Sequence, residues 1–367
     1  MAARPFFVNL NLQYCRKWVL KLLHFVCPPI KMVVLKTKTI FMSSKVSLGF
    51  FPTPLHRLSN LEERYKGFEI FIKRDDQTGL ASGGNKTRKL EYLMAAALEQ
   101  GCNTVVTLGA QQSNHCRQTA AACSVLGLKC HLIVKGEEPA MPQGNLLLSV
   151  VLGAKIHYAG SYISDNFVDA VLNKLKQEGE NPYLITYGGS DETGLLGFVD
   201  AMGELKMQLE TRNLNIDYIF FASCSGGTQA GLMAGKEKFG INAKLMPVSI
   251  QKPEAGLPSL VELVLKLANR AVKSLGIDCI FSESDAEIIT GYDEAGYGVV
   301  TGNERQAIFE LAQTEGILLD VVYTARAFGA MTDFIQKQKV KSGSRLLFWH
   351  TGGLPANFNY SVELLHP

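Results

Sequence analysis

Short apolar runs alternate with amphipathic stretches along the chain from Phe68 onward. This order is typical of an α/β protein, in which helices connect the strands of a mostly parallel sheet. The apolar runs predict strands at residues 68–73, 104–108, 129–134, 155–158, 183–186, 218–222, 244–249 and 346–349. The amphipathic stretches predict helices at residues 87–99, 114–126, 144–152, 165–178, 194–210 and 226–239.

Four segments rich in glycine and in polar side chains lie at predicted helix starts or strand ends. They are S-G-G-N-K-T-R-K-L-E at 82–91, Q-Q-S-N-H at 111–115, S-C-S-G-G-T at 223–228 and F-W-H-T-G-G at 348–353. The first turn of a helix presents unpaired N–H groups and a positive dipole end, which together hold a carboxylate or a phosphate. Because ligands of open parallel sheets bind beyond the carboxyl ends of the strands, we expect one shared site for an anionic ligand.

Lys86 is the candidate nucleophile in the first of these segments. A lysine that is partly shielded from water loses basicity and forms a Schiff base with a carbonyl. Spacing excludes a nucleotide P-loop, because Asn85 lies between Gly84 and Lys86, and the sequence has no Gly-x-Gly-x-x-Gly fingerprint. Taken alone, such a lysine is more often a solvated surface amine, so the neighbouring segments carry the assignment.

Length and charge restrict the possible classes of protein. The 367 residues, 47% of them hydrophobic, are enough for two domains that share a cleft. Most of the net charge of +3 comes from the first 61 residues, which contain nine Lys or Arg and no Asp or Glu. The remainder is slightly acidic, so we expect no nucleic-acid partner, and the apolar stretches are too short to predict a membrane span.

The acid-free start allows three interpretations. Residues 1–41 are a mitochondrial presequence, an unstructured extension, or the product of an over-called translation start with Met42 opening the domain. We expect a cytoplasmic protein, with a mitochondrial one as the alternative. The cysteines form no C-x-x-C pair and no zinc spacing, so we expect no metal site and predict buried free thiols at Cys15, Cys27, Cys102, Cys116, Cys123, Cys130, Cys224 and Cys279.

Taken together, the four segments resemble those of the fold-type II pyridoxal-phosphate enzymes, a group similar to the tryptophan synthase β subunit. More narrowly, the chain resembles the D-cysteine desulfhydrase and 1-aminocyclopropane-1-carboxylate deaminase family. The resemblance runs from about Leu48 to Tyr360 and includes F-P-T-P-L-H-R-L at 51–58. It implies a homodimeric enzyme whose subunit has two α/β domains, each an open sheet flanked by helices, with pyridoxal 5'-phosphate in the cleft. We place a large cofactor-binding domain at 42–88 and 198–367 and a small domain at 89–197.

The resemblance also implies roles for single residues. It makes Lys86 the lysine that bonds the cofactor and acts as base, and Asn114 the donor to the phenolic oxygen of the cofactor. The implied phosphate ligands are Ser225, Gly226, Gly227 and Thr228, with added charge from Lys89. The implied substrate carboxylate site is Ser113, Asn114 and His115, with Ser113 also a candidate acid or base. Tyr297 and Tyr323 match tyrosines on the substrate side, although a lone tyrosine is more often structural.

The family's two activities differ in the group that faces the ring nitrogen of the cofactor. Deaminases carry Y-E-G-K and H-L-G-G, with a glutamate near that nitrogen, where this chain has Y-T-A-R at 323–326 and H-T-G-G at 350–353. A hydroxyl at Thr351 bonds a neutral nitrogen, whereas a carboxylate keeps it protonated and deepens the electron sink. We therefore expect α,β-elimination of D-cysteine to pyruvate, ammonia and hydrogen sulfide, with the deaminase activity as the alternative.

Two further alternatives stay open at this stage. The family's D-P-V-Y-T-G-K-A appears here with Val321, Ala325 and Arg326 as departures, so other β-substituted amino acids remain candidate substrates. In a different class, a non-catalytic protein that binds a nucleotide or an amino acid explains the glycine-rich helix starts. That second alternative does not explain a lysine combined with three matching segments.

Overall fold

The computed structural model describes residues 44–251 and 258–366, to which all structural statements below refer. Its strands are β1 (Leu55–Arg57), β2 (Glu69–Arg74), β3 (Thr104–Ala110), β4 (Lys129–Lys135), β5 (Lys155–Tyr158), β6 (Pro182–Ile185), β7 (Tyr218–Ser223), β8 (Lys244–Ser249) and β9 (Arg345–His350). Its α-helices are α1 (Ser59–Glu62), α2 (Lys86–Glu99), α3 (Asn114–Leu126), α4 (Gly144–Val151), α5 (Asp165–Gln177), α6 (Leu196–Thr211), α7 (Gly227–Phe239), α8 (Leu260–Leu275), α9 (Gly302–Glu315), α10 (Thr324–Gln336) and α11 (Ser361–Leu365). No helix in this part of the chain is both long and apolar enough to cross a membrane.

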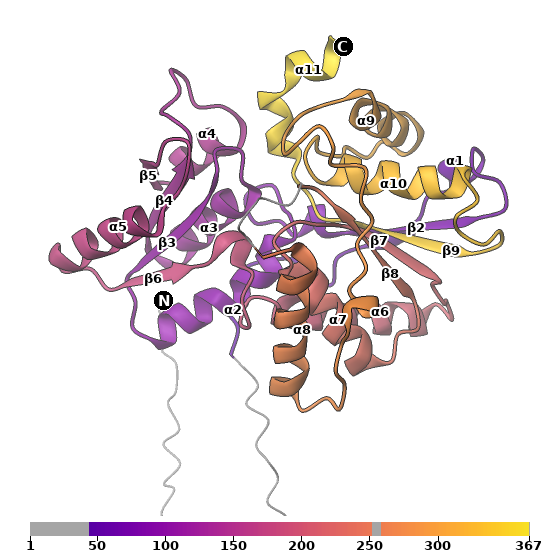
Figure 1. The fold of residues 1–367 in the computed structure, drawn as a ribbon, viewed down its shortest axis with the longest axis horizontal. Helices are drawn as coiled ribbons and strands as arrows, with labels where there is room; N and C mark the ends of the chain where they lie inside the picture. Colours follow the sequence, from indigo (N-terminus) through magenta and orange to yellow (C-terminus); the bar gives the residue numbers. More distant parts are fainter. Residues whose placement is uncertain (1–43, 252–257, 367) are drawn as a thin grey trace, which may run out of the picture. The chain divides into compact units, whose positions relative to one another are not determined.

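The larger sheet has the strand order β1-β2-β9-β7-β8, and only β1 runs antiparallel to its neighbour. Successive side chains of a strand point to opposite faces. Ile70 and Ile72 therefore pack with α9 and α10, whereas Phe71 and Trp349 pack with α6 and α7. Figure 1 shows these helix pairs on opposite sides of the sheet. Because both faces are covered, the parallel strands have continuous apolar runs at their centres, as such strands usually do.

The smaller sheet has the order β5-β4-β3-β6 and is parallel throughout. Its faces are likewise both covered. Val105 and Leu132 pack with α2 and α3, and Val106 and Ile133 pack with α5. The predicted fold class, with two mostly parallel sheets flanked by helices, is confirmed.

Helix α2 is tied to the larger sheet by a buried ionic cluster two residues beyond Lys86. Arg88 makes a bidentate pair with Asp75, with N···O distances of 2.7 and 2.8 Å, and also pairs with Glu204 of α6. Trp349 of β9 donates its indole N–H to the same Asp75 carboxylate at 2.8 Å. Because a planar guanidinium fork fixes distance and angle together, this cluster sets where α2 begins and hence where Lys86 lies.

The predicted elements are all present, and the boundary differences have simple causes. The strands predicted from apolar runs appear as β2–β9, and the predicted helices as α2–α7. Gly226 is the N-cap of α7 rather than its first residue, since its φ of 77° is left-handed. The sequence did not predict β1, α1 or α8–α11. The division of residues 42–367 into two domains stays a prediction.

The thiol prediction is correct for four of the described cysteines and wrong in part for two. Cys102, Cys116, Cys123 and Cys130 are buried and free, whereas Cys224 and Cys279 are free but only partly buried. Cys224 is partly accessible because it lines a pocket. Cys15, Cys27 and the predicted extension at 1–41 lie outside the described residues.

Candidate active site

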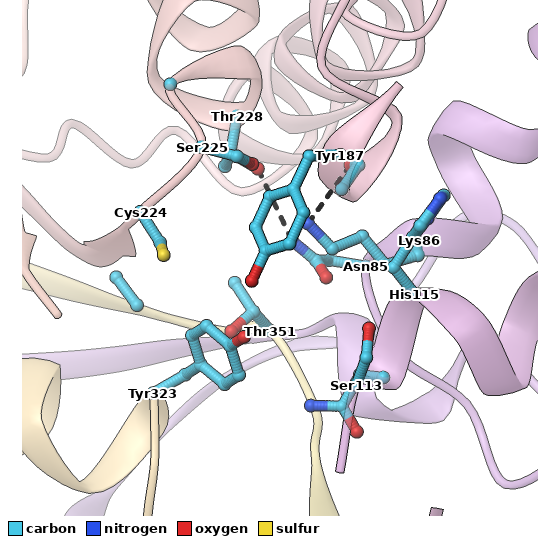
Figure 2. A pocket seen from close by; sticks show the side chains of 14 residues that line it. Asn85, Lys86, Ser113, His115, Tyr187, Cys224, Ser225, Thr228, Tyr323 and Thr351 are labelled. Carbon is cyan, nitrogen blue, oxygen red and sulfur yellow. Dashed lines mark hydrogen bonds between the residues drawn. The ribbon is translucent and has the colours of Figure 1, made fainter. Parts of the chain in front are cut away.

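One pocket lies where the strands β3, β7 and β9 end at their carboxyl sides. The segments that follow these strands supply Ser113, Ser225 and Thr351 to its wall. Figure 2 shows Ser225 and Thr228 on one side of the pocket and Ser113 and Tyr323 on the other. The pocket is lined by Asn85, Lys86, Ser113, Asn114, His115, Tyr187, Gly188, Ala222, Cys224, Ser225, Gly226, Thr228, Tyr323 and Thr351.

Lys86 is the first residue of α2, and its amine reaches the pocket. The Nζ atom donates to the Gly188 carbonyl at 3.4 Å, a long contact that holds the amine weakly. Burial lowers the pKa of Lys86 to about 8. At a pH near 8 about half of these amines are neutral, which is the form that attacks a carbonyl or removes a proton.

Lys89 lies one turn further along α2, behind the pocket wall. It is fully buried and donates to the Gly188 carbonyl at 3.1 Å and to the Ser190 hydroxyl at 2.9 Å. Ser190 in turn shares a hydrogen bond of 2.7 Å with the Ser225 hydroxyl. Burial, and then the neighbouring Lys86, hold the pKa of Lys89 well below its usual value. This chain connects the second lysine to the anion loop.

The segment 223–228 forms a loop that ends at the N-terminus of α7. The loop offers an anion two kinds of donor: the unpaired N–H groups of the first helical turn and the hydroxyl groups of Ser225 and Thr228. Gly227 is required because a Cβ atom there would lie 2.6 Å from the Ser190 Oγ and 2.8 Å from the Lys89 Nζ. The loop fits a phosphate group, with Lys89 close behind it.

The start of α3 forms the opposite side of the pocket. The Ser113 hydroxyl caps the helix by accepting from the Cys116 N–H at 3.2 Å, which leaves its own proton available to donate. The His115 Nε2 lies 2.9 Å from the Thr107 hydroxyl. Burial, and then Lys86 and Lys89, hold the pKa of His115 well below its usual value, so its ring is neutral. The N–H groups of Asn114 and His115 are in the first helical turn and suit a carboxylate.

Tyr323 lines the pocket, and Tyr297 stands directly behind it. Their hydroxyl groups are 2.6 Å apart, and their rings meet edge to face. Burial raises the pKa of both phenols well above the usual value, so both stay protonated. One of the two phenol protons forms the hydrogen bond between the tyrosines, and the proton of the other phenol is available for donation to a third group. Burial also raises the pKa of the neighbouring Cys224 thiol to about 11.

The segment that contains Thr351 packs closely against the loop before Lys86. The Asn85 N–H donates to the Thr351 carbonyl at 2.9 Å, and a Cβ atom on Gly352 would lie 2.7 Å from the Gly84 Cα. The Asn85 side chain also donates to the Thr228 hydroxyl, at 3.4 Å. Among the described residues that line this pocket, none carries a carboxylate.

The structure brings most of the sequence-predicted site residues together. Lys86, Ser113, Asn114, His115, Ser225, Gly226, Thr228, Tyr323 and Thr351 line the pocket. Lys89 and Tyr297 do not line it but bond residues that do. Gly227 does not line it either and lies in the chain between the lining residues Gly226 and Thr228. The sequence analysis missed Asn85, Tyr187, Gly188, Ala222 and Cys224. The Gly188-Gly189 pair was the sequence signal that could have identified the segment with Tyr187 and Gly188.

Comparison with known families adds to this geometry. The family described as "Pyridoxal-phosphate dependent enzyme" matches residues 46–352. A D-cysteine desulfhydrase of Klebsiella pneumoniae (strain 342) is 39% identical over 320 residues, which cover 85% of this chain and 95% of the relative. A protein of Pyrococcus abyssi (strain GE5 / Orsay), named provisionally as a 1-aminocyclopropane-1-carboxylate deaminase, is 38% identical over 327 residues, which cover 88% and 95% of the two chains.

A solved structure is also similar. The crystal structure of a protein described as the ACC deaminase homologue, where ACC is 1-aminocyclopropane-1-carboxylate, is 35% identical. It superimposes with a TM-score of 0.80 and covers 88% of this chain and 96% of its own.

Proposed function

Because the chain belongs to the family of pyridoxal-phosphate dependent enzymes, we propose that it catalyses the α,β-elimination of D-cysteine to pyruvate, ammonia and hydrogen sulfide. Its relatives support pyridoxal-phosphate dependent elimination as the reaction class and are divided between two substrates. The non-catalytic alternative is set aside, because the matched family consists of enzymes. When bound, the cofactor supplies the electron sink.

The donor set of the pocket fits the cofactor. We assign the phosphate to Ser225, Gly226, Gly227 and Thr228 at the start of α7. Lys89 adds positive charge behind this loop through Ser190. At the other end, the Lys86 amine reaches the pocket from α2 and is the group that bonds the cofactor aldehyde.

Lys86 is also the base in this proposal. Once the amino group of the substrate has replaced it, its amine is free to remove the Cα proton. A neutral amine is needed, and burial already brings its pKa to about 8. We expect turnover to rise as the pH approaches 8 from below, because the fraction of neutral amine rises.

The substrate carboxylate is assigned to the start of α3. Ser113 donates its hydroxyl proton, and the first-turn N–H groups of Asn114 and His115 complete the site. The Tyr323 phenol, still protonated because its pKa is raised, is a donor toward the β-substituent. Tyr297 holds it in place through the contact of 2.6 Å.

One observation favours the desulfhydrase over the deaminase: the described lining residues include no carboxylate. We assign Thr351 to the ring nitrogen, which its hydroxyl leaves neutral. Thr324, which aligns with the glutamate of the deaminases, is buried and donates its hydroxyl to Asp320 at 2.6 Å. Ring opening lacks an easily expelled β-substituent and therefore depends more on a deep electron sink than thiol elimination does.

The test is a product assay on the purified protein with added pyridoxal phosphate. D-Cysteine, L-cysteine and 1-aminocyclopropane-1-carboxylate are supplied separately, and sulfide, pyruvate and 2-oxobutyrate are measured. We expect sulfide and pyruvate from D-cysteine, and little or no 2-oxobutyrate. Preferential 2-oxobutyrate formation from the cyclopropane acid would show that the chain is a deaminase instead.

A further inference from the structure

The side-chain amide of Asn114 is fixed by two donors. Its Oδ1 accepts from the Arg117 Nη1 at 2.7 Å and from the Asn145 Nδ2 at 3.0 Å. An amide oxygen has two acceptor positions, so both are occupied. The NH2 group is then the end that remains for the pocket, which Asn114 lines.

Arg117 itself is a buried cation with no carboxylate in hydrogen-bond contact; the buried Asp320 acts on it only through space. Its side chain is fully buried, and its partners are all neutral oxygens: the amides of Asn114 and Asn145 and the Gly83 carbonyl, at 2.8 Å. Within the described part of the chain, no carboxylate forms an ion pair with it. Burial lowers the pKa of Arg117 to about 10, so it stays protonated at neutral pH. Such a charge is costly to bury, so its position calls for a reason.

Asn145 joins three segments to this cation. It is the second residue of α4. Its backbone N–H donates to the Gln112 side-chain oxygen and its Nδ2 donates to the Gln112 backbone carbonyl, each at 2.9 Å. Its own Oδ1 accepts from Arg117. The Gly83 carbonyl, which also accepts from Arg117, lies in the loop that leads to Lys86. The network therefore holds Asn114 in register with the start of α2.

We propose that Arg117 and Asn145 are positioning residues that hold the Asn114 NH2 group toward an anionic oxygen of the cofactor, with the unpaired Arg117 charge strengthening that donor. The inference rests on the proposed function, since it takes the phenolic oxygen of pyridoxal phosphate as the acceptor. Arg117 donates directly to the Asn114 amide, so its charge polarises that amide and favours negative charge on the oxygen that the NH2 group faces. Removing that influence makes protonation of the bound cofactor easier.

The test measures the pH at which the visible absorbance of the bound cofactor titrates, with pyridoxal phosphate at saturation. Asn145→Asp keeps the shape of the side chain, gives Arg117 a counter-charge and replaces the donor to Asn114 with an acceptor. We expect the titration to move upward by about one to two pH units. Arg117→Lys keeps the charge but loses the fork, because one ammonium cannot reach all three acceptors, so we expect a smaller upward shift.

A matched control separates this effect from loss of structure. Asn269 in α8 makes two hydrogen bonds with Phe281, one as donor and one as acceptor, and it does not line the pocket. Asn269→Asp makes the same chemical change and should leave the titration where it is in the parent. Five titratable groups face the pocket from the other segments, and Asp320 acts on Arg117 from the segment before α10. All are the same in every variant: Lys86, His115, Cys224, Tyr187, Tyr323 and Asp320.

The outcomes are separable. A parent protein that acquires no visible band from pyridoxal phosphate would contradict the proposed function itself. A parent that has the band, together with Asn145→Asp and Arg117→Lys variants that titrate at the parent's pH, would overturn this inference alone. A shift of equal size in the Asn269→Asp control would also overturn it, because the effect would then not be specific to Asn114.

Discussion

Arg117 and Arg326 are both buried beside the candidate site, but only Arg326 forms an ion pair with a carboxylate. Arg326 of α10 pairs with Glu304 at 2.8 Å and donates to the carbonyls of Ile250, Gly296 and Val299. Arg117 has the same kind of fork, yet all its partners are neutral. The paired Arg326 holds in place the segment that carries Tyr297, through its bonds to the Gly296 and Val299 carbonyls. A cation left unpaired projects its charge onto its neighbours.

Lys86→Ala gives the largest effect and the reference point for both regions. It removes both the cofactor bond and the base, so we expect sulfide release to fall by at least about 10³-fold, since general base catalysis alone contributes 10²–10⁴-fold. The visible band that depends on the lysine should also be lost. Turnover at the parent rate with an unchanged spectrum would remove Lys86 from the site.

The two arginines should separate when each is replaced by methionine. Arg326→Met leaves Glu304 buried without its partner, so we expect a loss of about 3–5 kcal/mol in the free energy of unfolding. Arg117→Met leaves neutral acceptors unsatisfied but also removes a buried charge, so we expect a smaller loss of about 1–3 kcal/mol. Urea denaturation of both holoenzymes measures the difference. Equal losses in the free energy of unfolding would contradict the distinction between an ion-paired and an unpaired arginine.

Thr228→Val tests the anion loop independently of both arginines. The variant keeps the shape of the side chain and removes one hydroxyl donor to a charged group, which is worth about 1.5–3 kcal/mol. Cofactor affinity should therefore fall by roughly 10- to 100-fold, as measured by titrating the apoprotein with pyridoxal phosphate. Thr211→Val is the matched control, because its hydroxyl donates to a carbonyl within α6 and is exposed. Unchanged affinity in Thr228→Val would count against the assignment.

Tyr297→Phe sharpens the role of the segment that Arg326 holds in place and gives the smallest effect. The variant keeps the ring and removes the hydrogen bond to Tyr323, which is worth about 0.5–1.5 kcal/mol. We expect KM for D-cysteine to rise by up to about tenfold, with the absorbance of the bound cofactor unchanged. A changed titration of that absorbance would place the effect of this tyrosine on the cofactor side, together with Arg117.

The strands and anion loops were predictable because their signals are local. A parallel strand buried on both faces is a run of apolar residues in the sequence. The loop at 223–228 is recognisable in the sequence from its Ser, Gly and Thr residues before a helix. Helix α10, whose buried residues include the polar Thr324 and Arg326, was not predicted. Strand β1 is only three residues long and lies among prolines.

The supporting network of the site gave no sequence signal. Arg117 and Asn145 are 28 positions apart and lie on different helices. Their contact depends on how α3 and α4 pack, which neither segment encodes alone. Ser190 was missed for the same reason, since only folding brings it between Lys89 and Ser225.

The Gly188 carbonyl accepts from two amines at once, the Lys86 Nζ at 3.4 Å and the Lys89 Nζ at 3.1 Å. In the proposed function the Lys86 amine leaves and returns in every catalytic cycle, whereas the Lys89 amine has no such role. A buried carbonyl that lost its only donor would add the cost of an unmade hydrogen bond to each departure. With Lys89 bonded to the same carbonyl, the proposed departure of Lys86 leaves the hydrogen bonding of this backbone complete and adds no such cost.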